Sequence, residues 1–420
     1  MKITQYVLLA VLGIFIVWKG VIPALTKIDT DFPTYYTSAR LLMDGEDIAK
    51  MYDDKWFNEQ VQRYGINHLG RFTPFPPIAA FIMLPIAYLP PLQALQAWTV
   101  INLAALSVMI LLLSKILQRD IAWCSLLALG SGLALINNIR FGQFYLILSL
   151  LIIVSYYWWQ KNRYIASGTM LGIGAALKYF PALYLPLFII QREWKIIVMV
   201  CTTILVLTFL SLLVFGIEVH QQFLTSVLGG HLSGEMHDPF LSIYQSWNSL
   251  LRRLFVYDSA LNAHPLLQSP TMFYVSKYCI LVSIAIPTII GLMKAQRAFG
   301  NKAPVVQFAL LNVAGLLALP SSATYHFLLL ILPIGILLSL HEKDLTIEQK
   351  ILIVCYAAIG FMPYRFFRPF DGQGILTVLA YPRLWLMTAI FITTLVFIWR
   401  NCVPRQSVVE LGSVSASAGF

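Results

Sequence analysis

The chain has 420 residues, of which 59% are hydrophobic and only 11% are charged, and its mean hydropathy is +0.75. Soluble domains carry about 25% charged residues, so this composition excludes a soluble protein and indicates an integral membrane protein. The net charge of +10 requires no nucleic-acid partner, because basic connections orient membrane proteins. The five cysteines form no CxxC or metal-ligand spacing, so we expect neither a disulfide framework nor a zinc site.

Apolar stretches of about membrane length follow one another along the chain. They lie at about 4–26, 75–91, 94–117, 121–139, 143–159, 165–190, 196–216, 273–293, 304–319, 323–340, 350–364 and 376–399. The alternating ten-residue strands of a β-barrel are absent, which predicts an all-α polytopic bundle of about 12 transmembrane helices. We expect one transmembrane domain over residues 1–402 and a disordered cytoplasmic tail over 403–420.

Two longer polar stretches, at about 27–74 and 217–272, separate the apolar segments. With the N-terminus in the cytoplasm, a twelve-span count places both stretches on the outer face and the C-terminus inside. The strongest basic connections, at 294–302 and 343–350, then face the cytoplasm, in agreement with the positive-inside rule.

The middle of the chain allows a second threading. The twelve-span count leaves the basic pairs at 115–119 and 161–163 outside, against the rule, and leaves Lys178 near mid-membrane, where a charge is costly. The alternative makes 75–91 an interfacial or re-entrant segment and breaks 165–190 at the Tyr-Phe-Pro that follows Lys178. It returns both basic pairs to the cytoplasm, and the sequence does not decide between the two.

The first polar stretch opens with two acids, Asp29 and Asp31, a few residues beyond the first apolar helix. A carboxylate at this boundary suits a general base that removes a proton from an attacking hydroxyl. Asp31 also precedes Phe-Pro, a pattern typical of a helix N-cap with proline in the first turn. The residue pattern does not separate these two roles, which are compatible.

Polar groups interrupt the later apolar segments at two points. Segment 137–143 reads Asn-Asn-Ile-Arg-Phe-Gly-Gln and brings Arg140 and Gln143 to a membrane boundary, where a tight turn needs fewer polar groups. Lys178 follows a glycine-rich segment whose small residues allow close helix packing. An intramembrane ionisable group is a candidate functional residue, and the Lys178 ammonium suits a lipid phosphate.

The second polar stretch contains Gln245 and Ser246 ahead of the pair Arg252 and Arg253. Guanidinium groups match the geometry of a phosphate, although the same pair could anchor a helix at the membrane interface. The histidines and acids between 231 and 238 follow no known ligand spacing, so we expect no metal there.

His326 closes the segment Leu-Pro-Ser-Ser-Ala-Thr-Tyr-His at the start of another apolar stretch. A histidine at such a position can be an interfacial residue with satisfied hydrogen bonds. In the twelve-span count it shares the outer face with Asp31, which favours a functional role.

In this order the motifs resemble glycosyltransferase family 87, the polyprenyl-phosphate-mannose-dependent mannosyltransferases of the GT-C superfamily. The resemblance covers about residues 28–335. It rests on Asp31-Phe with Tyr35-Tyr36, Gly45 ahead of Tyr52, Phe75-Pro-Pro, Leu89-Pro, Gly142-Gln143, Gly168 to Gly174 with Lys178 and Pro181, Gln245-Ser246 with Arg253, and Ser321-Ser322 ahead of His326. One departure is that the family's Ser-Pro…Trp-His-His stretch reads Ser-Ala-Thr-Tyr-His here.

The resemblance implies an inverting transfer of a sugar, most simply mannose, from a polyprenyl-phosphate donor to a lipid-linked or envelope glycan acceptor. Asp31 matches the family's first-loop acid, the expected base, and His326 matches a histidine near the donor phosphate or in proton transfer. Other residues expected to bind donor phosphate or substrate are Lys178, Arg253, Arg252, Gln143, Arg140, Tyr35, Gln245 and Ser246.

The implied GT-C protein lies in the inner membrane of a bacterium, with an extracytoplasmic active site and membrane lipids around it. We expect no cofactor, because activated lipid-phosphate sugars need no nucleotide-binding domain and the chain has no GxxxxGK[ST] motif. One carboxylate, one or two cations and a sheltered cavity suffice for such chemistry.

Two other classes remain open from the residues alone. An O-antigen polymerase or ligase also has about twelve spans and a large outer loop, but it would concentrate Arg and His in the late loop without an acidic first loop, against Asp31. A polytopic transporter of lipid or sugar would place charges along a central path, and only Lys178 indicates one.

Overall fold

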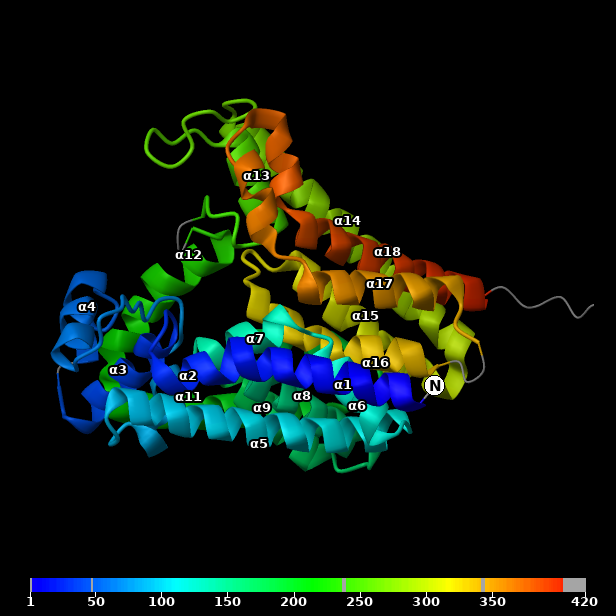
Figure 1. Cartoon of the computed structure of the whole chain (residues 1–420), viewed down its shortest axis with the longest axis horizontal. Helices are drawn as coiled ribbons and strands as arrows, with labels where there is room; N and C mark the ends of the chain where they lie inside the picture. The colour runs from blue at the N-terminus through cyan, green and yellow to red at the C-terminus, as the bar shows by residue number, and fades with distance from the viewer. Residues whose placement is uncertain (1, 47, 236–238, 341–343, 403–420) are drawn as a thin grey trace, which may run out of the picture.

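The computed structural model describes residues 2–46, 48–235, 239–340 and 344–402 (Figure 1), so the tail expected at 403–420 lies outside the described residues. The all-α class is confirmed: the described residues form helices, with one isolated β-bridge between Asp258 and Asn262. The α-helices are α1 (Lys2–Ile16), α2 (Ile22–Thr26), α3 (Phe32–Met43), α4 (Asp54–Arg63), α5 (Pro91–Leu117), α6 (Ile121–Leu129), α7 (Leu133–Arg140), α8 (Tyr145–Gln160), α9 (Tyr164–Leu177), α10 (Leu185–Ile190), α11 (Trp194–Gln222), α12 (Leu228–Ser233), α13 (Trp247–Phe255), α14 (Pro270–Phe299), α15 (Ala303–Ala318), α16 (Ile331–Ser339), α17 (Ile347–Phe361) and α18 (Pro382–Cys402).

Shorter 3₁₀ and π segments join or extend these helices. They are η1 (Val17–Val21), η2 (Ile48–Lys50), η3 (Pro77–Ile86), η4 (Phe180–Tyr184), η5 (Phe223–Val227), η6 (Gly300–Lys302), η7 (Thr324–Leu330), η8 (Tyr364–Phe370) and η9 (Gly374–Ala380).

Polar side chains in the connections start several of the helices. The Asp120 carboxylate accepts a hydrogen bond from the Trp123 backbone N–H at 2.7 Å and caps α6. Thr346 and Gln349 form a reciprocal capping box at the start of α17. Such caps satisfy backbone donors that the first helical turn leaves unpaired, so each helix begins where the apolar sequence begins.

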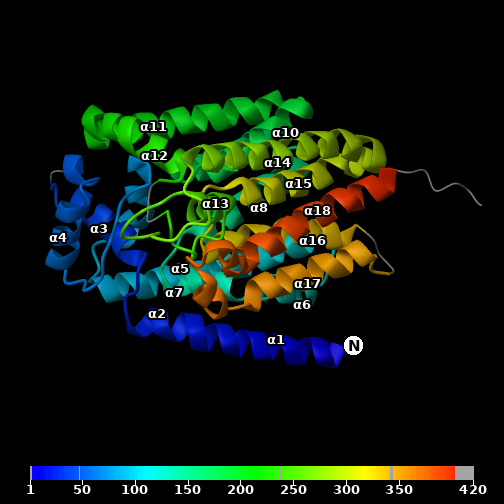
Figure 2. The same ribbon diagram turned by 90° about the horizontal axis from the view of Figure 1, so that it is seen from above.

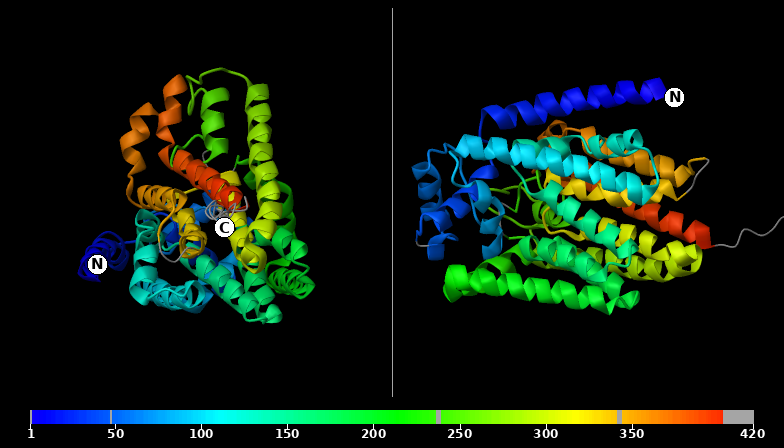
Figure 3. Two further views of the ribbon diagram at one scale, coloured as in Figure 1. Left: turned by 90° about the vertical axis from the view of Figure 1, so that its right-hand side faces the viewer. Right: turned by 90° about the horizontal axis from the view of Figure 1, so that it is seen from below.

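The long helices run side by side along the long axis of the molecule, with α1 and α11 on opposite flanks (Figures 2 and 3). The start of α1 and the end of α18 lie at one end of the bundle, where Arg400 of α18 pairs with Glu348 of α17. Helices α3 and α4 lie at the opposite end, where Arg140 at the end of α7 pairs with Asp29 just after α2. The bundle therefore has two distinct ends.

Five helices are long and apolar enough to cross a membrane, or up to seven if each of two bent pairs is one span. The bent pairs are α6 with α7, at 74°, and α17 with η8, at 80°. Shorter apolar helices accompany them, so a membrane protein is supported and the count of about twelve spans stays a prediction. The five spans are Ile3–Thr26, Pro91–Leu117, Trp194–Ser233, Pro270–Ala318 and Pro382–Cys402.

The segment at 75–91 is not a long helix. It forms η3, ten residues of 3₁₀ helix packed against α3, with the Tyr36 hydroxyl donating to the Leu89 carbonyl at 2.8 Å and Arg40 donating to the Ala87 carbonyl at 3.1 Å. Ten residues rise only about 20 Å in a 3₁₀ helix, less than the roughly 30 Å of a bilayer core. This short segment agrees with the alternative topology, in which 75–91 is interfacial or re-entrant.

The segment at 165–190 turns back on itself. Helix α9 ends at Leu177, Lys178 is extended, and Pro181 opens η4, since proline has no N–H to continue the α9 hydrogen bonds. Just beyond α10, the Glu193 carboxylate accepts a hydrogen bond from the Trp159 indole at 3.1 Å, which returns the chain to the end of α8. Lys178 therefore lies at the tip of a return.

A second return follows later in the chain. Helix α15 ends at Ala318, residues 319–323 form the tip, and η7 with α16 pack back against α15. The end of α16 lies beside the start of α17, because the Gln349 amide donates to the Leu337 carbonyl at 2.9 Å. The two returns bring Lys178 and His326 to the same region of the molecule.

Glycines set the close packing of α9 on α11. A Cβ on Gly168 would lie 2.6 Å from the Met199 Cβ, and one on Gly172 would lie 2.6 Å from the Thr203 Cβ. Small residues let two helix backbones approach inside a membrane, where the hydrophobic effect does not drive helix pairing. The glycine-rich run before Lys178 is therefore used for packing and fixes the position of that return.

Candidate active site

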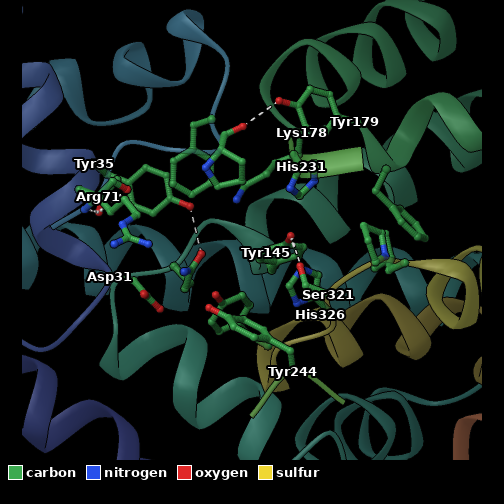
Figure 4. A pocket seen from close by; sticks show the side chains of 18 of the residues that line it. Asp31, Tyr35, Arg71, Tyr145, Lys178, Tyr179, His231, Tyr244, Ser321 and His326 are labelled. Atoms are coloured by element: carbon green, nitrogen blue, oxygen red, sulfur yellow. Dashed lines mark hydrogen bonds between the residues drawn. The ribbon is translucent and has the colours of Figure 1, made fainter. Parts of the chain in front are cut away.

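A cavity of about 830 Å³ lies at the end of the bundle that holds α3. Its wall is assembled from the start of α3, the segment 68–76, the start of α8, the two tips described above, and α12. Figure 4 shows ionisable side chains from these separate elements around one space. The ionisable side chains of the wall include Asp31, Arg71, Tyr145, Lys178, His231 and His326.

Asp31 lies at the N-cap position of α3, yet its side chain makes no capping hydrogen bond. It is half-buried and faces the cavity, outside the membrane-spanning segments. Burial raises the pKa of this carboxyl from its ordinary 3.8 to about 6, while a hydrogen bond from Gln143 and the Lys178 ammonium act in the opposite direction. The carboxyl group of Asp31 therefore has a pKa closer to neutrality than an ordinary aspartate, as the predicted general base requires.

Gln143 orients the groups next to Asp31. Its side-chain oxygen accepts a hydrogen bond from the Tyr35 hydroxyl at 3.0 Å, which leaves the amide N–H groups to donate to Asp31. Tyr35 and Gln143 are almost fully buried, with 0% and 2% of their surfaces exposed. A buried amide with defined partners holds the carboxylate in one orientation.

The neighbouring acid Asp29 has a different partner. Arg140 donates to it from Nε at 2.8 Å and from Nη2 at 2.7 Å, and the Asp29 side chain is only 13% exposed. Asp29 does not line the cavity, whereas Asp31 does. The two acids are therefore distinguished by tertiary contacts, with Asp29 neutralised by Arg140 and Asp31 left facing the space.

Lys178 projects from the tip of the first return towards several aromatic rings. Its ammonium lies 3.8 Å from the ring centroid of Phe75, 4.9 Å from that of Tyr145 and 5.8 Å from that of Tyr35. Cation–π contacts of this kind hold an ammonium without neutralising its charge. An anionic group that enters the cavity would therefore meet this basic side chain.

His326 is fixed on both ring nitrogens. Nδ1 faces the Ala323 carbonyl at 3.1 Å, and since a carbonyl only accepts, Nδ1 carries the proton in the neutral ring. Nε2 then accepts from the Tyr145 hydroxyl at 2.6 Å. The rings of Tyr145 and Tyr325 stack with centroids 5.2 Å apart and flank the imidazole. This packing sets the tautomer and the direction of the histidine.

Besides Arg140, four predicted substrate-binding residues lie outside the cavity wall. Arg252 pairs with Glu235 at 3.5 Å and stacks over the Phe273 ring, whereas Arg253 pairs with Asp371 at 3.0 Å.

Gln245 and Ser246 are buried just before α13, and the Ser246 hydroxyl caps that helix by accepting from the Ser249 N–H at 3.2 Å. All four predicted residues thus contact other protein groups, as Arg140 does with Asp29.

Several residues of the wall had no role in the sequence-based prediction. Tyr145 and Tyr325 lie next to predicted residues, two positions after Gln143 and one before His326, so their adjacency was the available signal. Arg71 precedes the Phe-Thr-Pro-Phe-Pro-Pro stretch, and its guanidinium pairs with Asp54 at 2.8 Å. Long-range pairs of this type leave no periodic pattern in a sequence.

The arrangement combines a carboxyl group, a lysine amine and an imidazole around one cavity. A carboxylate of raised pKa can accept a proton, and an ammonium can stabilise a developing anion. Among the described residues, no three His, Cys, Asp or Glu side chains lie close enough together to hold a metal ion. His237 and Asp238 lie outside the described residues.

Comparison with known families agrees with this chemistry. A model of glycosyltransferase family 87 matches residues 72–333, more than half of the chain. The matched range contains Gln143, Lys178 and His326 and begins after Asp31. A search of curated proteins finds no match. The chain belongs to glycosyltransferase family 87 and is a membrane glycosyltransferase.

Proposed function

We propose that this enzyme is an inverting transferase that moves a sugar, most simply mannose, from a polyprenyl-phosphate donor to a hydroxyl of a lipid-linked or envelope glycan, with Asp31 as the general base. The observation that carries the proposal is the cavity in which Asp31, Lys178 and His326 meet at one end of an otherwise apolar bundle. Family membership supports sugar transfer, and the charges of the cavity support a phosphate leaving group.

The reaction is a single displacement at the anomeric carbon. The acceptor oxygen forms a bond to that carbon while its proton passes to the Asp31 carboxylate. The bond between the carbon and the phosphate oxygen breaks, and its electron pair leaves with the polyprenyl phosphate. Inversion follows because nucleophile and leaving group lie on opposite faces of the sugar. No covalent enzyme intermediate is required.

Lys178 is the proposed partner of the leaving phosphate. Its ammonium is held by aromatic rings within the wall, so negative charge that develops on the phosphate meets a cation already in place. His326, fixed by Tyr145, lies on the same wall as a hydrogen-bonding group for a phosphate or sugar oxygen. A cavity of about 830 Å³ is within the roughly 300–1,000 Å³ usual for ligand sites.

The chemistry of the lining indicates where each substrate lies. The segment that carries Asp31 and the neighbouring 68–71 contribute polar groups, including Arg71, which favours a hydrophilic acceptor beside the base. Leu183 of η4 and Ala318 at the end of α15 contribute apolar groups to another part of the wall. An isoprenoid chain is expected on that apolar side, where it continues towards membrane lipid.

The location of basic residues supports an extracytoplasmic cavity in the bacterial inner membrane. Lys115, Arg119 and Lys161 line one basic hollow, and Lys294 lies over the Trp399 ring near the end of α18. The ends of α5, α8 and α18, which carry or adjoin these groups, lie at the end of the bundle where α1 begins, away from α3. Since cytoplasmic connections carry the excess of Lys and Arg, the cavity faces the other side.

The direct test compares Asp31→Asn with Asp29→Asn in membranes supplied with polyprenyl-phosphate mannose. We expect Asp31→Asn to lower the transfer rate by about 10²–10⁴-fold, because an amide cannot accept the proton. In Asp29→Asn the side chain still lies next to Arg140, outside the cavity, so this variant should retain much more activity than Asp31→Asn. Product formation is followed by transfer of radiolabelled sugar.

Thermal unfolding in detergent controls for misfolding. Because burial raises the pKa of Asp31, its ionised form opposes folding above pH about 6, so the neutral amide introduced by Asp31→Asn should not lower the melting temperature. Undiminished transfer by Asp31→Asn contradicts the base assignment. Absence of transfer by the wild-type enzyme from any polyprenyl-phosphate sugar contradicts the donor assignment.

A further inference from the structure

The tip between α15 and η7 contributes much of one cavity wall. Leu319, Pro320 and Ser321 line the space, and Tyr325 and His326 follow on the first turn of η7. A tip has no helical hydrogen bonds of its own, so its conformation depends on what holds it from outside.

The start of α13 holds the tip through two buried contacts. The Gln245 backbone N–H donates to the Ser322 carbonyl at 3.0 Å, and the Ser246 hydroxyl donates to the Pro320 carbonyl at 2.8 Å. Gln245 and Ser246 are 2% and 1% exposed. The Gln-Ser motif thus acts on the tip rather than on the cavity itself.

Arg383, in the first turn of α18, holds the tip from the other side. Its guanidinium donates from Nη1 to the Thr324 hydroxyl at 2.6 Å and from Nη2 to the Met362 carbonyl at 3.0 Å. Its backbone N–H donates to the Gln245 side-chain oxygen at 3.0 Å. One residue therefore joins α13, the end of α17 and the segment that carries His326.

The energetic setting of Arg383 is unusual. The side chain is 1% exposed, its Nε has no hydrogen-bond partner, and no carboxylate of the described residues lies within ion-pair distance of it. A buried charge without an opposite charge disfavours folding, so stability alone does not explain an arginine here. A planar fork does bridge two acceptors in a fixed geometry, which a neutral side chain of similar size would not.

We propose that Arg383, Gln245 and Ser246 are positioning residues that fix the segment 319–326, which comprises the tip and the first turn of η7, so that His326 and Tyr325 meet the substrate in the cavity. The proposal rests on the proposed sugar transfer for its functional meaning. It also has a structural content that is measurable without activity, namely the rigidity of the tip.

Thr324→Val tests the proposal with the smallest change. It removes the hydroxyl that Arg383 bonds and keeps the side-chain shape, whereas Thr324→Ser keeps the hydroxyl. Thr394→Val is the matched control, because Thr394 is a buried threonine of α18 whose hydroxyl bonds only within its own helix, to the Ile390 carbonyl.

We expect Thr324→Val to lower kcat by about 10–100-fold with the donor KM changed less than about twofold, because a small misplacement of cavity groups acts on the transition state. Thr324→Ser and Thr394→Val should retain wild-type kcat. Arg383→Lys, which keeps the charge but not the fork, should reproduce the loss. Equal kcat for Thr324→Val and Thr394→Val overturns the proposal.

The rate of maleimide labelling at Ser321→Cys gives the readout that does not depend on transfer. With the background of the parental chain subtracted, labelling should be faster when Thr324→Val or Arg383→Lys is added and unchanged with Thr394→Val. Unchanged labelling with both Thr324→Val and Arg383→Lys overturns the positioning role, even if transfer is observed. Faster labelling in an enzyme that transfers no lipid-linked sugar supports the positioning role and refutes only the proposed function.

Discussion

At the scale of single residues, a residue can occupy a helix N-cap position without using its side chain for capping. Asp31 occupies the N-cap position of α3, but its carboxylate is not used for capping and faces the cavity. A cap residue has its backbone fixed by the helix, so the free carboxylate is still held in place. The backbone of Asp31 thus occupies the N-cap position while its side chain lines the cavity, where the base role stays a prediction.

The pH dependence of transfer is a prediction at this scale. Asp31 accepts a proton only when ionised, and burial raises its pKa to about 6. Activity should therefore be low below pH 6 and rise about tenfold per pH unit as the pH approaches 6. The measurement is kcat/KM from about pH 4.5 to 8.5 with enzyme stability checked at each pH. An acid limb centred near pH 4, the ordinary value for a carboxylate, contradicts the assignment.

At the scale of elements, the cavity depends on two chain returns. The returns at 178–181 and 319–323 each place a candidate site residue at or just beyond the tip of a hairpin of apolar segments. Hydropathy detects the apolar segments but not the reversal, since both a straight span and a return bury the same residues. The proline after Lys178 was the local signal that the α-helix ends there.

Packing of the first return gives the prediction for this scale. Gly168→Ala places a Cβ 2.7 Å from the Ile196 carbonyl oxygen and should force α9 away from α11. We expect a loss of about 1–3 kcal/mol in the free energy of unfolding, together with reduced transfer because Lys178 moves. Gly13→Ala in α1 is the control, because a Cβ there meets nothing within 4 Å. Equal melting temperatures for the two variants in detergent contradict the packing argument.

At the scale of the whole molecule, charge is divided between the two ends of the bundle. The cavity end carries the acids Asp29 and Asp31, whereas basic groups such as Lys115 and Lys161 gather at the end where α1 begins. The proposed lipid-linked substrates require a cavity at one membrane surface, and this division of charge supports the side opposite the basic connections.

Labelling by a membrane-impermeant maleimide tests this sidedness. Leu69 is 75% exposed on the rim of the cavity, and Lys161 is exposed at the opposite end. In right-side-out vesicles, Leu69→Cys should react at once and Lys161→Cys only after permeabilisation. The native exposed Cys201 and Cys279 lie in apolar helices and provide the background. Reaction in the reverse order contradicts an extracytoplasmic cavity.

The sequence by itself determined the membrane class, the all-α fold, the family and the main candidates Asp31, Lys178 and His326. Hydropathy and ordered motifs are local properties, so they are readable without a structure. The tertiary structure decided which polar groups face the cavity and which already pair with other protein groups. Asp29 pairs with an arginine 111 positions away, and Gln245 and Arg252, expected at substrate, contact protein instead. Such pairings follow from the packing of distant segments, which no local pattern encodes.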